Sequence, residues 1–361
     1  MGVKRPRPEE PAADGANGAA SSSGAEDHWA LAGDSSCGSE TEDEERSEKH
    51  YMLRMGDTFD DGRYRVLRQL GKGTFGRVVE MEDTNFGQKV AVKVVRAIEK
   101  YTHEAEIEAD ILRRVQRSLP DEEDFPIVRL RRTFEWRGHY CIVSNTLGPS
   151  LYMTLKAARR RFEDAERRSG GRSSGKSSGD ARGRYFDLGQ VSRIAGHCLR
   201  AVAHLHGIGL AHTDLKLENI LHVPGGRADA VAIIDFGGAT WEEDGGSSHV
   251  VCTRQYRPPE VTLGIGWGRE VDLWSLGCIF AELWTGELLF QTHDEIEHLA
   301  LMERMLGTLP RHMLKRVTTR RLDRAVRHGA LRWPEQALDR ESEAHVRAQP
   351  RLRDVIIGRC A

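Results

Sequence analysis

The sequence lacks the features that mark secreted or membrane-bound proteins. Its six cysteines form no C-x-x-C pair and no dense cluster, which favours a reduced, intracellular compartment over a disulfide-stapled scaffold. No apolar run is long enough to span a bilayer, because Glu282 interrupts the longest one, Leu273–Trp284. The chain begins Met-Gly, but Pro6 stands where a myristoylation signal needs Ser or Thr. We therefore expect no lipid anchor and no membrane partner.

Apolar residues are scarce in residues 1–50, where Trp29 and Leu31 are nearly all that the segment has to bury. It carries five basic against twelve acidic residues, a net charge of −7, whereas residues 51–361 carry +5. This composition predicts a disordered acidic tail. Its basic cluster Lys4-Arg5-Pro6-Arg7 has two equal interpretations, a nuclear import signal and a solvated tetrapeptide.

The chain does contain a stretch suited to phosphoryl transfer, written H-T-D-L-K-L-E-N at His212–Asn219. Asp214 can accept the proton of an attacking hydroxyl, and Lys216 can neutralise charge on the moving phosphoryl group. Asn219 can hold Mg²⁺ against phosphates together with Asp235, which opens an Asp-Phe-Gly turn after a strand-like run. Each tripeptide alone is weak evidence, but the ordered set predicts the catalytic loop of a protein kinase.

A glycine-rich segment, G-K-G-T-F-G-R-V, lies upstream at residues 71–78. In dinucleotide-binding folds such a motif opens a helix, whereas here a strand-like run continues, so we predict a hairpin folded over ATP phosphates. The strand V-A-V-K that follows ends in Lys93, which suits the α- and β-phosphates. Residues 145–148 should form a hinge between two lobes, with Ser144 at the back of the nucleotide pocket. The expected nucleotide-binding residues are Leu70, Gly71, Lys72, Gly73, Thr74, Phe75, Gly76, Arg77, Val78, Ala91, Lys93, Asn145 and Leu147.

The partner of Lys93 should come from a helix predicted at residues 103–115. Glu104, Glu106 and Glu108 all lie in it, and helical phase places Glu108 between isoleucines on the inward side. We choose Glu108, and the alternative is an exposed pair between Glu108 and an arginine of the same helix.

Two residues further along the chain should support the catalytic loop. Thr253, in an activation segment that closes at Pro258-Pro259-Glu260, is placed to bond Asp214 and Lys216 and to favour a hydroxyl substrate. Asp272 opens a buried helix and can tie down the backbone of the loop.

A different kind of segment, residues 159–184, has nine basic and four acidic residues and no apolar period. It predicts a flexible basic insert. A docking or autophosphorylation segment is one interpretation, and a tolerated loop insertion is the one we favour.

The stretch E-H-L-A-L-M-E-R-M-L-G-T-L-P at residues 297–310 closely resembles the hallmark of the LAMMER-type (CDC-like) dual-specificity protein kinases of the CMGC group. His212-Thr213-Asp214 and the short spacing from Lys93 to Glu108 are also similar to that family. The resemblance covers nearly everything after residue 62.

This resemblance implies an α+β, two-lobed protein kinase fold, with a small β-rich N-lobe at 64–147 and a larger α-helical C-lobe at 148–361. It implies catalytic roles for Lys93, Glu108, Asp214, Lys216 and Thr253, metal binding by Asn219 and Asp235, and ATP and Mg²⁺ as cofactors. The expected enzyme is a nuclear, monomeric kinase that phosphorylates Ser/Thr of Arg/Ser-rich splicing factors, with Tyr autophosphorylation as a second specificity and no direct contact with nucleic acid.

The chain departs from the family pattern at four places. Leu217 replaces the usual Pro, Ser144 replaces a bulky Phe, and residues 223–230 are too few for the hairpin insert that LAMMER kinases carry there. The chain also stops at Ala361, before helices that supply an Arg for the carboxylate at the Glu260 position. We therefore expect a truncated C-lobe.

Two other function classes compete with an active kinase. A catalytically weak pseudokinase or scaffold that binds splicing factors is favoured by the chain end, whereas the complete set of chemical residues favours the enzyme. A nucleic-acid binder using the basic insert ranks lowest, because the insert has no interleaved aromatic residues.

Overall fold

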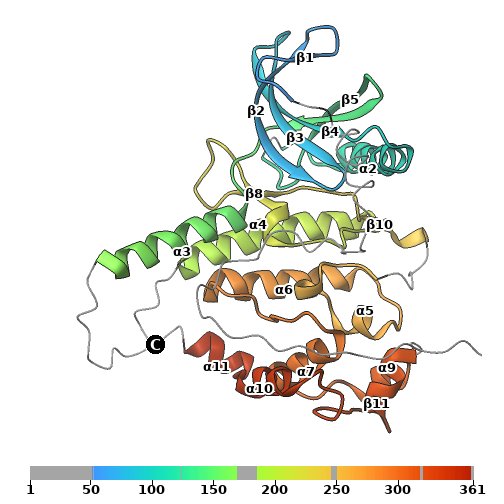
Figure 1. The fold of residues 1–361 in the computed structure, drawn as a ribbon. Coiled ribbons are helices and arrows are strands. Elements are labelled where there is room, and N and C mark those ends of the chain that lie inside the picture. The colour runs from blue at the N-terminus through green and yellow to red at the C-terminus, as the bar shows by residue number, and fades with distance from the viewer. Residues whose placement is uncertain are drawn as a thin grey trace, which may run out of the picture.

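The computed structural model describes residues 51, 53–122, 124–168, 185–244, 250–317 and 320–358. The predicted disordered tail, 1–50, lies outside the described residues. The described chain folds into a small lobe built on a curled sheet and a larger helical lobe below it (Figure 1). The two-lobed kinase fold predicted from the sequence is confirmed.

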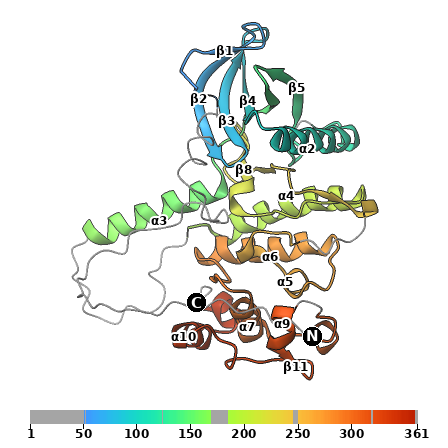
Figure 2. The same ribbon diagram turned by 45° about the vertical axis from the view of Figure 1, so that its right-hand side comes forward.

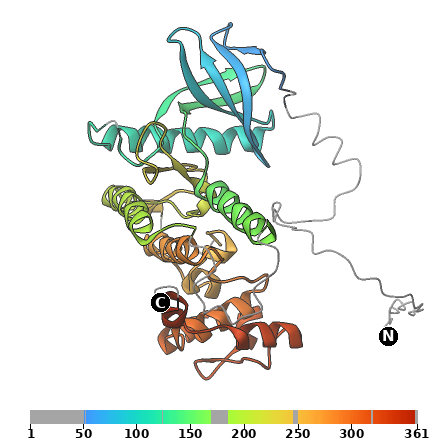
Figure 3. The same cartoon turned by 90° about the vertical axis from the view of Figure 1, so that its left-hand side faces the viewer.

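The small lobe is one antiparallel sheet with a single long helix against it (Figure 3). Alternating side chains of the strands fill a core that includes Val66, Met81, Val92 and Val143, all nearly inaccessible to solvent. The strands run in the order β1-β2-β3-β4-β6-β5. Their bounds are Thr58–Phe59 (β1), Tyr64–Gly73 (β2), Gly76–Asp83 (β3), Gln88–Val95 (β4), Leu130–Trp136 (β5) and His139–Asn145 (β6), and the helix α2 is Glu99–Ser118.

The small lobe begins earlier than the pattern at Tyr64 indicates. β1 pairs with the start of β2, and the ring of Tyr51 lies edge-on to Phe59 at 5.2 Å and to Trp136 at 4.8 Å between centroids. Phe59 is fully buried. A two-residue strand is too short to show alternation in the sequence, so these aromatic contacts, which form in three dimensions, were missed.

The large lobe is organised around α6, which lies between α4 above and α7, α10 and α11 below (Figure 1). α6 is apolar on most of its surface and is buried along nearly its whole length, as a helix at the centre of a domain must be. The helices are Leu151–Arg168 (α3), Leu188–Gly207 (α4), Pro259–Leu263 (α5), Glu270–Thr285 (α6), Glu295–Leu306 (α7), Arg311–Leu314 (α8), Arg320–Ala325 (α9), Arg340–Ala348 (α10) and Leu352–Ile357 (α11).

Short strands and 3₁₀ turns connect these helices. The strands form two-stranded sheets: β8 with β9 and β11 with β12 are hairpins, whereas β7 pairs with β10, and the catalytic loop and the Asp-Phe-Gly turn lie in the chain between those two strands. They are Leu210–Ala211 (β7), Ile220–His222 (β8), Val231–Ile233 (β9), Thr240–Trp241 (β10), Val326–Arg327 (β11) and Ala330–Leu331 (β12), and the turns are Leu217–Asn219 (η1), Glu242–Asp244 (η2) and Arg254–Tyr256 (η3).

Helix α3 corrects part of the predicted flexible insert. It continues to Arg168, so residues 159–168 are helical rather than irregular, and the helix extends away from the body of the lobe (Figure 2). The segment has no apolar period because this half of α3 has little to pack on. Arg, Glu and Ala are strong helix formers, and Glu163 lies one turn from Arg167, 4.0 Å from its guanidinium. Residues 169–184 lie outside the described residues.

No helix within the described ranges has the length and apolar character needed to cross a membrane.

Candidate active site

The glycine-rich segment forms the tip of the β2–β3 hairpin, where Gly73 pairs with Gly76. A Cβ on Gly71 or Gly73 would meet no atom within 4 Å, so these two glycines leave open space beside the backbone. Gly76 has a different role, since a Cβ there would collide with the backbone carbonyl of Val94 in β4. The hairpin thus offers room for phosphates at its outer glycines and packs on the sheet at its last one.

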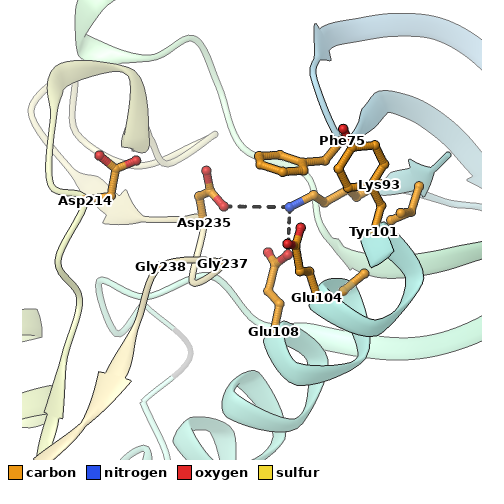
Figure 4. A pocket seen from close by; sticks show the side chains of 11 residues that line it. Phe75, Lys93, Tyr101, Glu104, Glu108, Asp214, Asp235, Gly237 and Gly238 are labelled. Atoms are coloured by element: carbon orange, nitrogen blue, oxygen red, sulfur yellow. Dashed lines mark hydrogen bonds and ion pairs between the residues drawn. The ribbon is translucent and has the colours of Figure 1, made fainter. Parts of the chain in front are cut away.

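Lys93, on β4, reaches into the space between the lobes (Figure 4). Its Nζ lies 2.7 Å from Oε2 of Glu108 and 3.7 Å from Oδ1 of Asp235. Glu108, chosen on helical phase, is buried in α2, whereas Glu104 and Glu106 are exposed. The structure therefore brings Lys93, Glu108 and Asp235 together, although they come from a strand, a helix and a loop.

Lys93 and Asp235 support each other's charge, whereas burial raises the pKa of the Glu108 carboxyl despite the neighbouring Lys93. Burial alone would lower the pKa of Lys93, but the carboxylates of Glu108 and Asp235 outweigh it and raise that pKa, so Lys93 stays protonated. Burial likewise opposes the ionised form of Asp235, yet Lys93, His212 and Lys216 outweigh burial and lower its pKa. The site therefore holds a cation and an anion ready to face phosphates and a metal ion.

The catalytic loop carries a second group, centred on Asp214. Its Oδ2 accepts a hydrogen bond from Lys216 Nζ at 2.8 Å, and its Oδ1 accepts one from Thr253 Oγ1 at 2.7 Å. Lys216 Nζ also donates to Thr253 Oγ1 at 3.4 Å. Thr253 thus makes both contacts expected of it and joins the activation segment to the loop.

The backbone of the catalytic loop is held from below by Asp272, at the start of α6. The amides of His212 and Thr213 each donate to its carboxylate at 2.8 Å. Thr213 has a positive φ of 65°, a conformation that needs such support for a β-branched residue. Its hydroxyl donates to the carbonyl of Gly238 at 2.6 Å, which links the loop to the first residues of the activation segment.

The β8–β9 hairpin sets the distance between the two predicted metal ligands. Asn219 precedes β8 and Asp235 follows β9, and the two strands are antiparallel. The amide of Ile234 donates to the carbonyl of Asn219 at 3.0 Å. Residues far apart in the sequence are therefore held at the same end of one ladder.

A cavity of about 260 Å³ joins both groups and is lined by residues of both lobes (Figure 4). The sequence had pointed to five of its lining residues: Phe75, Lys93, Glu108, Asp214 and Asp235. It missed Val95, Tyr101, Ala105 and Gly238, considered Glu104 only as a partner of Lys93, and named Gly237 only as part of the Asp-Phe-Gly turn. A signal for some of them exists, because Tyr101, Glu104 and Ala105 lie seven, four and three positions before Glu108 and share its face of α2.

The predicted hinge and its flank lie beside β4. Ser144 pairs with Ala91 in the β4–β6 ladder, so both point to the face of the sheet that carries Lys93. The side chain of Asn145 accepts a hydrogen bond from the amide of Arg129 at 2.7 Å. Among the other residues expected to bind nucleotide, Leu70 is exposed, whereas Val78 and Leu147 are half-buried.

Comparison with known proteins decides the family. The protein kinase domain family matches residues 64–328. The serine/threonine-protein kinase AFC1 of Arabidopsis thaliana is 40% identical over 333 residues, which cover 85% of this chain and 65% of AFC1. The dual specificity protein kinase CLK1 of Mus musculus is 35% identical over 311 residues, which cover 81% of this chain and 58% of CLK1. The chain belongs to the protein kinase family.

A solved structure agrees with this assignment. The crystal structure of a kinase domain has a TM-score of 0.75 and 33% sequence identity, and covers 86% of this chain and 90% of that one. The relatives include AFC kinases, CLK kinases and a dual specificity kinase of Schizosaccharomyces pombe. This confirms the LAMMER-type, CMGC-group resemblance seen in the sequence. The chain spans only part of these relatives: the match covers 65% of AFC1, 58% of CLK1 and 37% of the Schizosaccharomyces pombe kinase.

The donors of this kinase site fit Mg²⁺. Among the described residues no group of three or more His, Cys, Asp or Glu could hold a metal by itself. Asn219 donates through Nδ2 to the carbonyl of Asp214 at 2.9 Å, which leaves its amide oxygen as an acceptor at the end of the ladder where Asp235 also lies. Mg²⁺ takes one or two such hard oxygen ligands and completes its shell with phosphates and water.

Glu260, at the end of the activation segment of this kinase, was expected to lack the arginine that pairs with its carboxylate. Burial raises the pKa of its carboxyl. Within the described part of the chain it forms no ion pair.

Proposed function

We propose that the chain is an ATP- and Mg²⁺-dependent protein kinase that phosphorylates Ser and Thr in Arg/Ser-rich proteins, splicing factors above all. The observation that carries the proposal is the arrangement around one cavity: Lys93, Glu108 and Asp235 on one side and Asp214 with Lys216 and Thr253 on the other. A nucleotide and a hydroxyl substrate would meet between these two groups.

The residues divide the work of phosphoryl transfer. Lys93, fixed by Glu108, binds phosphate oxygens, and Asp214 orients the attacking hydroxyl and accepts its proton. Lys216 balances the charge of the phosphoryl group in transit. Asn219 and Asp235 would hold Mg²⁺, which supplies charge neutralisation between the phosphates when it is bound.

A preference for Arg-containing substrates is supported by Glu218, on η1 within the catalytic loop. It is exposed and forms no ion pair with another described residue, so a substrate guanidinium has a free carboxylate to bind. The acidic residues Glu242 and Glu243 are engaged elsewhere: Glu242 pairs with Arg269 at 3.4 Å and Glu243 with Arg114 at 3.2 Å.

The names of the relatives agree with this class of activity. AFC1 is called a serine/threonine-protein kinase and CLK1 a dual specificity protein kinase, and we extend both specificities to this chain. Nuclear localisation and a monomeric state complete the proposal. They rest on the family resemblance and, for the nucleus, on the basic cluster Lys4-Arg5-Pro6-Arg7.

The deciding experiment measures transfer of labelled phosphate from Mg-ATP to an Arg/Ser-repeat peptide. A matched peptide with Lys in place of Arg is the control for guanidinium recognition. Stoichiometric, Mg²⁺-dependent labelling with a clear preference for the Arg peptide is expected. Binding of the peptide and of ATP without transfer would establish the scaffold interpretation instead.

A further inference from the structure

Helix α2 is fastened to the activation segment at Arg114. The guanidinium carbon of Arg114 lies 3.6 Å from the centroid of the Trp241 ring, and its Nη2 lies 3.2 Å from Oε1 of Glu243. At this distance a guanidinium stacks on the ring face and gains from its quadrupole. One side chain of the small lobe therefore binds two residues that follow the Asp-Phe-Gly turn.

Trp241 is itself fixed to the large lobe. It belongs to β10, which pairs with β7 so that Trp241 lies opposite Leu210. The next amide, of Glu242, donates to the carbonyl of Gly209 at 2.8 Å, and the Glu242 carboxylate pairs with Arg269 at 3.4 Å. Since β7 leads directly into the catalytic loop, the contact with Arg114 joins α2 to the scaffold of that loop. Figure 1 shows β10 below α2 at this point.

Arg114 acts on the same rigid helix that carries Glu108. Glu108 contacts Lys93 at 2.7 Å, and a helix that turned or moved outward at its C-terminal half would withdraw that carboxylate. A second attachment lies one turn further on, where Ser118 Oγ and His204 Nε2 are 2.9 Å apart. The position of Glu108 in the cavity thus depends on contacts made at the other half of α2.

We infer that Arg114 and Trp241 are positioning residues that hold α2, and with it Glu108, in the catalytic arrangement without a phosphate on the activation segment. In place of a phosphate bound by arginines, the segment offers an aromatic face and the carboxylate of Glu243, and the cation comes from α2. The inference rests on the proposed kinase function, whose regulation it specifies.

The alternative is a surface contact without effect on the site. Arg114 has 51% and Glu243 69% of the side chain exposed, and ion pairs so exposed contribute little on average. The two cases differ in the role of the stacked ring. If the contact positions α2, most of its effect on kcat comes from the Trp241 ring and little from the Glu243 carboxylate.

The test compares Arg114→Ala, Trp241→Ala and the double variant with Arg117→Ala. Arg117 is an exposed arginine of α2 outside the contact with Trp241 and serves as the matched control. Two quantities are measured: kcat and KM on an Arg/Ser peptide, and amide hydrogen exchange of residues 105–115 without nucleotide. Thermal midpoints of all variants show whether each one is folded.

If the contact between Arg114 and Trp241 holds α2, either single variant lowers kcat about tenfold, or about 1.4 kcal/mol. The peptide KM stays unchanged, and amide exchange in α2 becomes faster. The double variant should be no worse than the worse single one, and Trp241→Phe should restore most of the rate. Wild-type kcat and exchange in Arg114→Ala would overturn the inference, as would an equal effect of Arg117→Ala.

The exchange measurement separates this inference from the proposed function. A wild-type protein without any transferase activity would refute the kinase proposal, yet exchange in α2 would still report whether Arg114 and Trp241 hold the helix.

Discussion

Ser144 is the residue at which the nucleotide pocket of this chain differs most from the family pattern. It faces the same side of the sheet as Ala91 and Lys93 and makes one weak contact, from its Oγ to the Ala91 carbonyl at 3.5 Å. We infer that a small hydroxyl in place of a phenyl ring leaves room behind the adenine.

We predict that the wild-type protein binds an ATP analogue with a benzyl group on the adenine amine at least about tenfold more tightly than Ser144→Phe does, a difference of about 1.4 kcal/mol. Unmodified ATP should bind both proteins alike, which is the control. Equal affinity of both proteins for the bulky analogue would show that Ser144 does not lie at the back of the pocket.

His298 gives a pH dependence to stability. It is buried in α7, its Nε2 has no hydrogen-bond partner among the described residues, and its ring lies 5.4 Å from that of Phe290. Burial, together with the positive charges of Arg257 and Arg254, lowers its pKa to about 3. The unfolded chain binds this proton near pH 6.5, so stability is lost as the pH falls below that value.

Between pH 7.5 and pH 5 the loss should be about 2 kcal/mol. In His298→Leu this part of the pH dependence should disappear, whereas substitution of the exposed His312 should leave it in place. Unfolding midpoints in urea at both pH values measure the difference. Parallel curves for wild type and His298→Leu would contradict the assignment.

At the residue scale the sequence led to most of the chemistry. Glu108 could be chosen over Glu104 and Glu106 because helical phase is a local property. Of the two isoleucines that flank it, Ile111 is buried as that phase requires, whereas Ile107 is exposed, so this part of the argument was wrong. The lining of the cavity by Tyr101 and Glu104 was missed. Their spacing places them on the face of α2 that carries Glu108, but which part of that face borders a cavity depends on neighbours in the other lobe.

At the scale of elements, the activation segment has unusual support. Thr213 stands where many kinases have an Arg beside the catalytic Asp, and it bonds the Gly238 carbonyl at 2.6 Å as a neutral donor. A buried arginine requires a phosphate for charge balance, whereas Thr213 requires none. Arg257, a nearby cation on the segment itself, already donates to the Cys252 carbonyl at 3.0 Å.

We therefore predict that activity does not depend on phosphorylation of this segment. With Thr240, Ser247 and Ser248 replaced by Ala and the protein dephosphorylated, initial rates on an Arg/Ser peptide should stay within about threefold of wild type, less than about 1 kcal/mol. A fall of a hundredfold or more, about 2.7 kcal/mol, would refute constitutive activity.

Helices and strands could be predicted where their apolar residues repeat at a regular spacing in the sequence. The apolar residues of 191–205 recur at helical spacing and predict the core of α4, whose N-terminus is set by a capping box between Asp187 and Gln190. β1 and the second half of α3 were missed for two different reasons. β1 is too short to alternate, and α3 extends beyond the surface on which an apolar stripe would pack.

At the scale of the molecule, the site exists because two lobes meet. The small lobe contributes Lys93 and Glu108, and the large lobe contributes Asp214 and Asp235, around one cavity of about 260 Å³. The sequence predicted the two lobes from motif order, but the way in which α2 contacts β10 through Arg114 depends on the packing of the lobes and could not be predicted.

The division of labour between the lobes is tested most directly by Asp214→Asn. The change keeps the size of the side chain and removes the group that accepts the proton, while Lys93 and the glycine hairpin remain to bind nucleotide. We expect kcat on an Arg/Ser peptide to fall by about 10²–10⁴-fold, with the affinity for Mg-ATP within about threefold of wild type, or less than about 1 kcal/mol. Turnover near the wild-type rate would contradict the role of Asp214 as the catalytic base, and with it the account of this site.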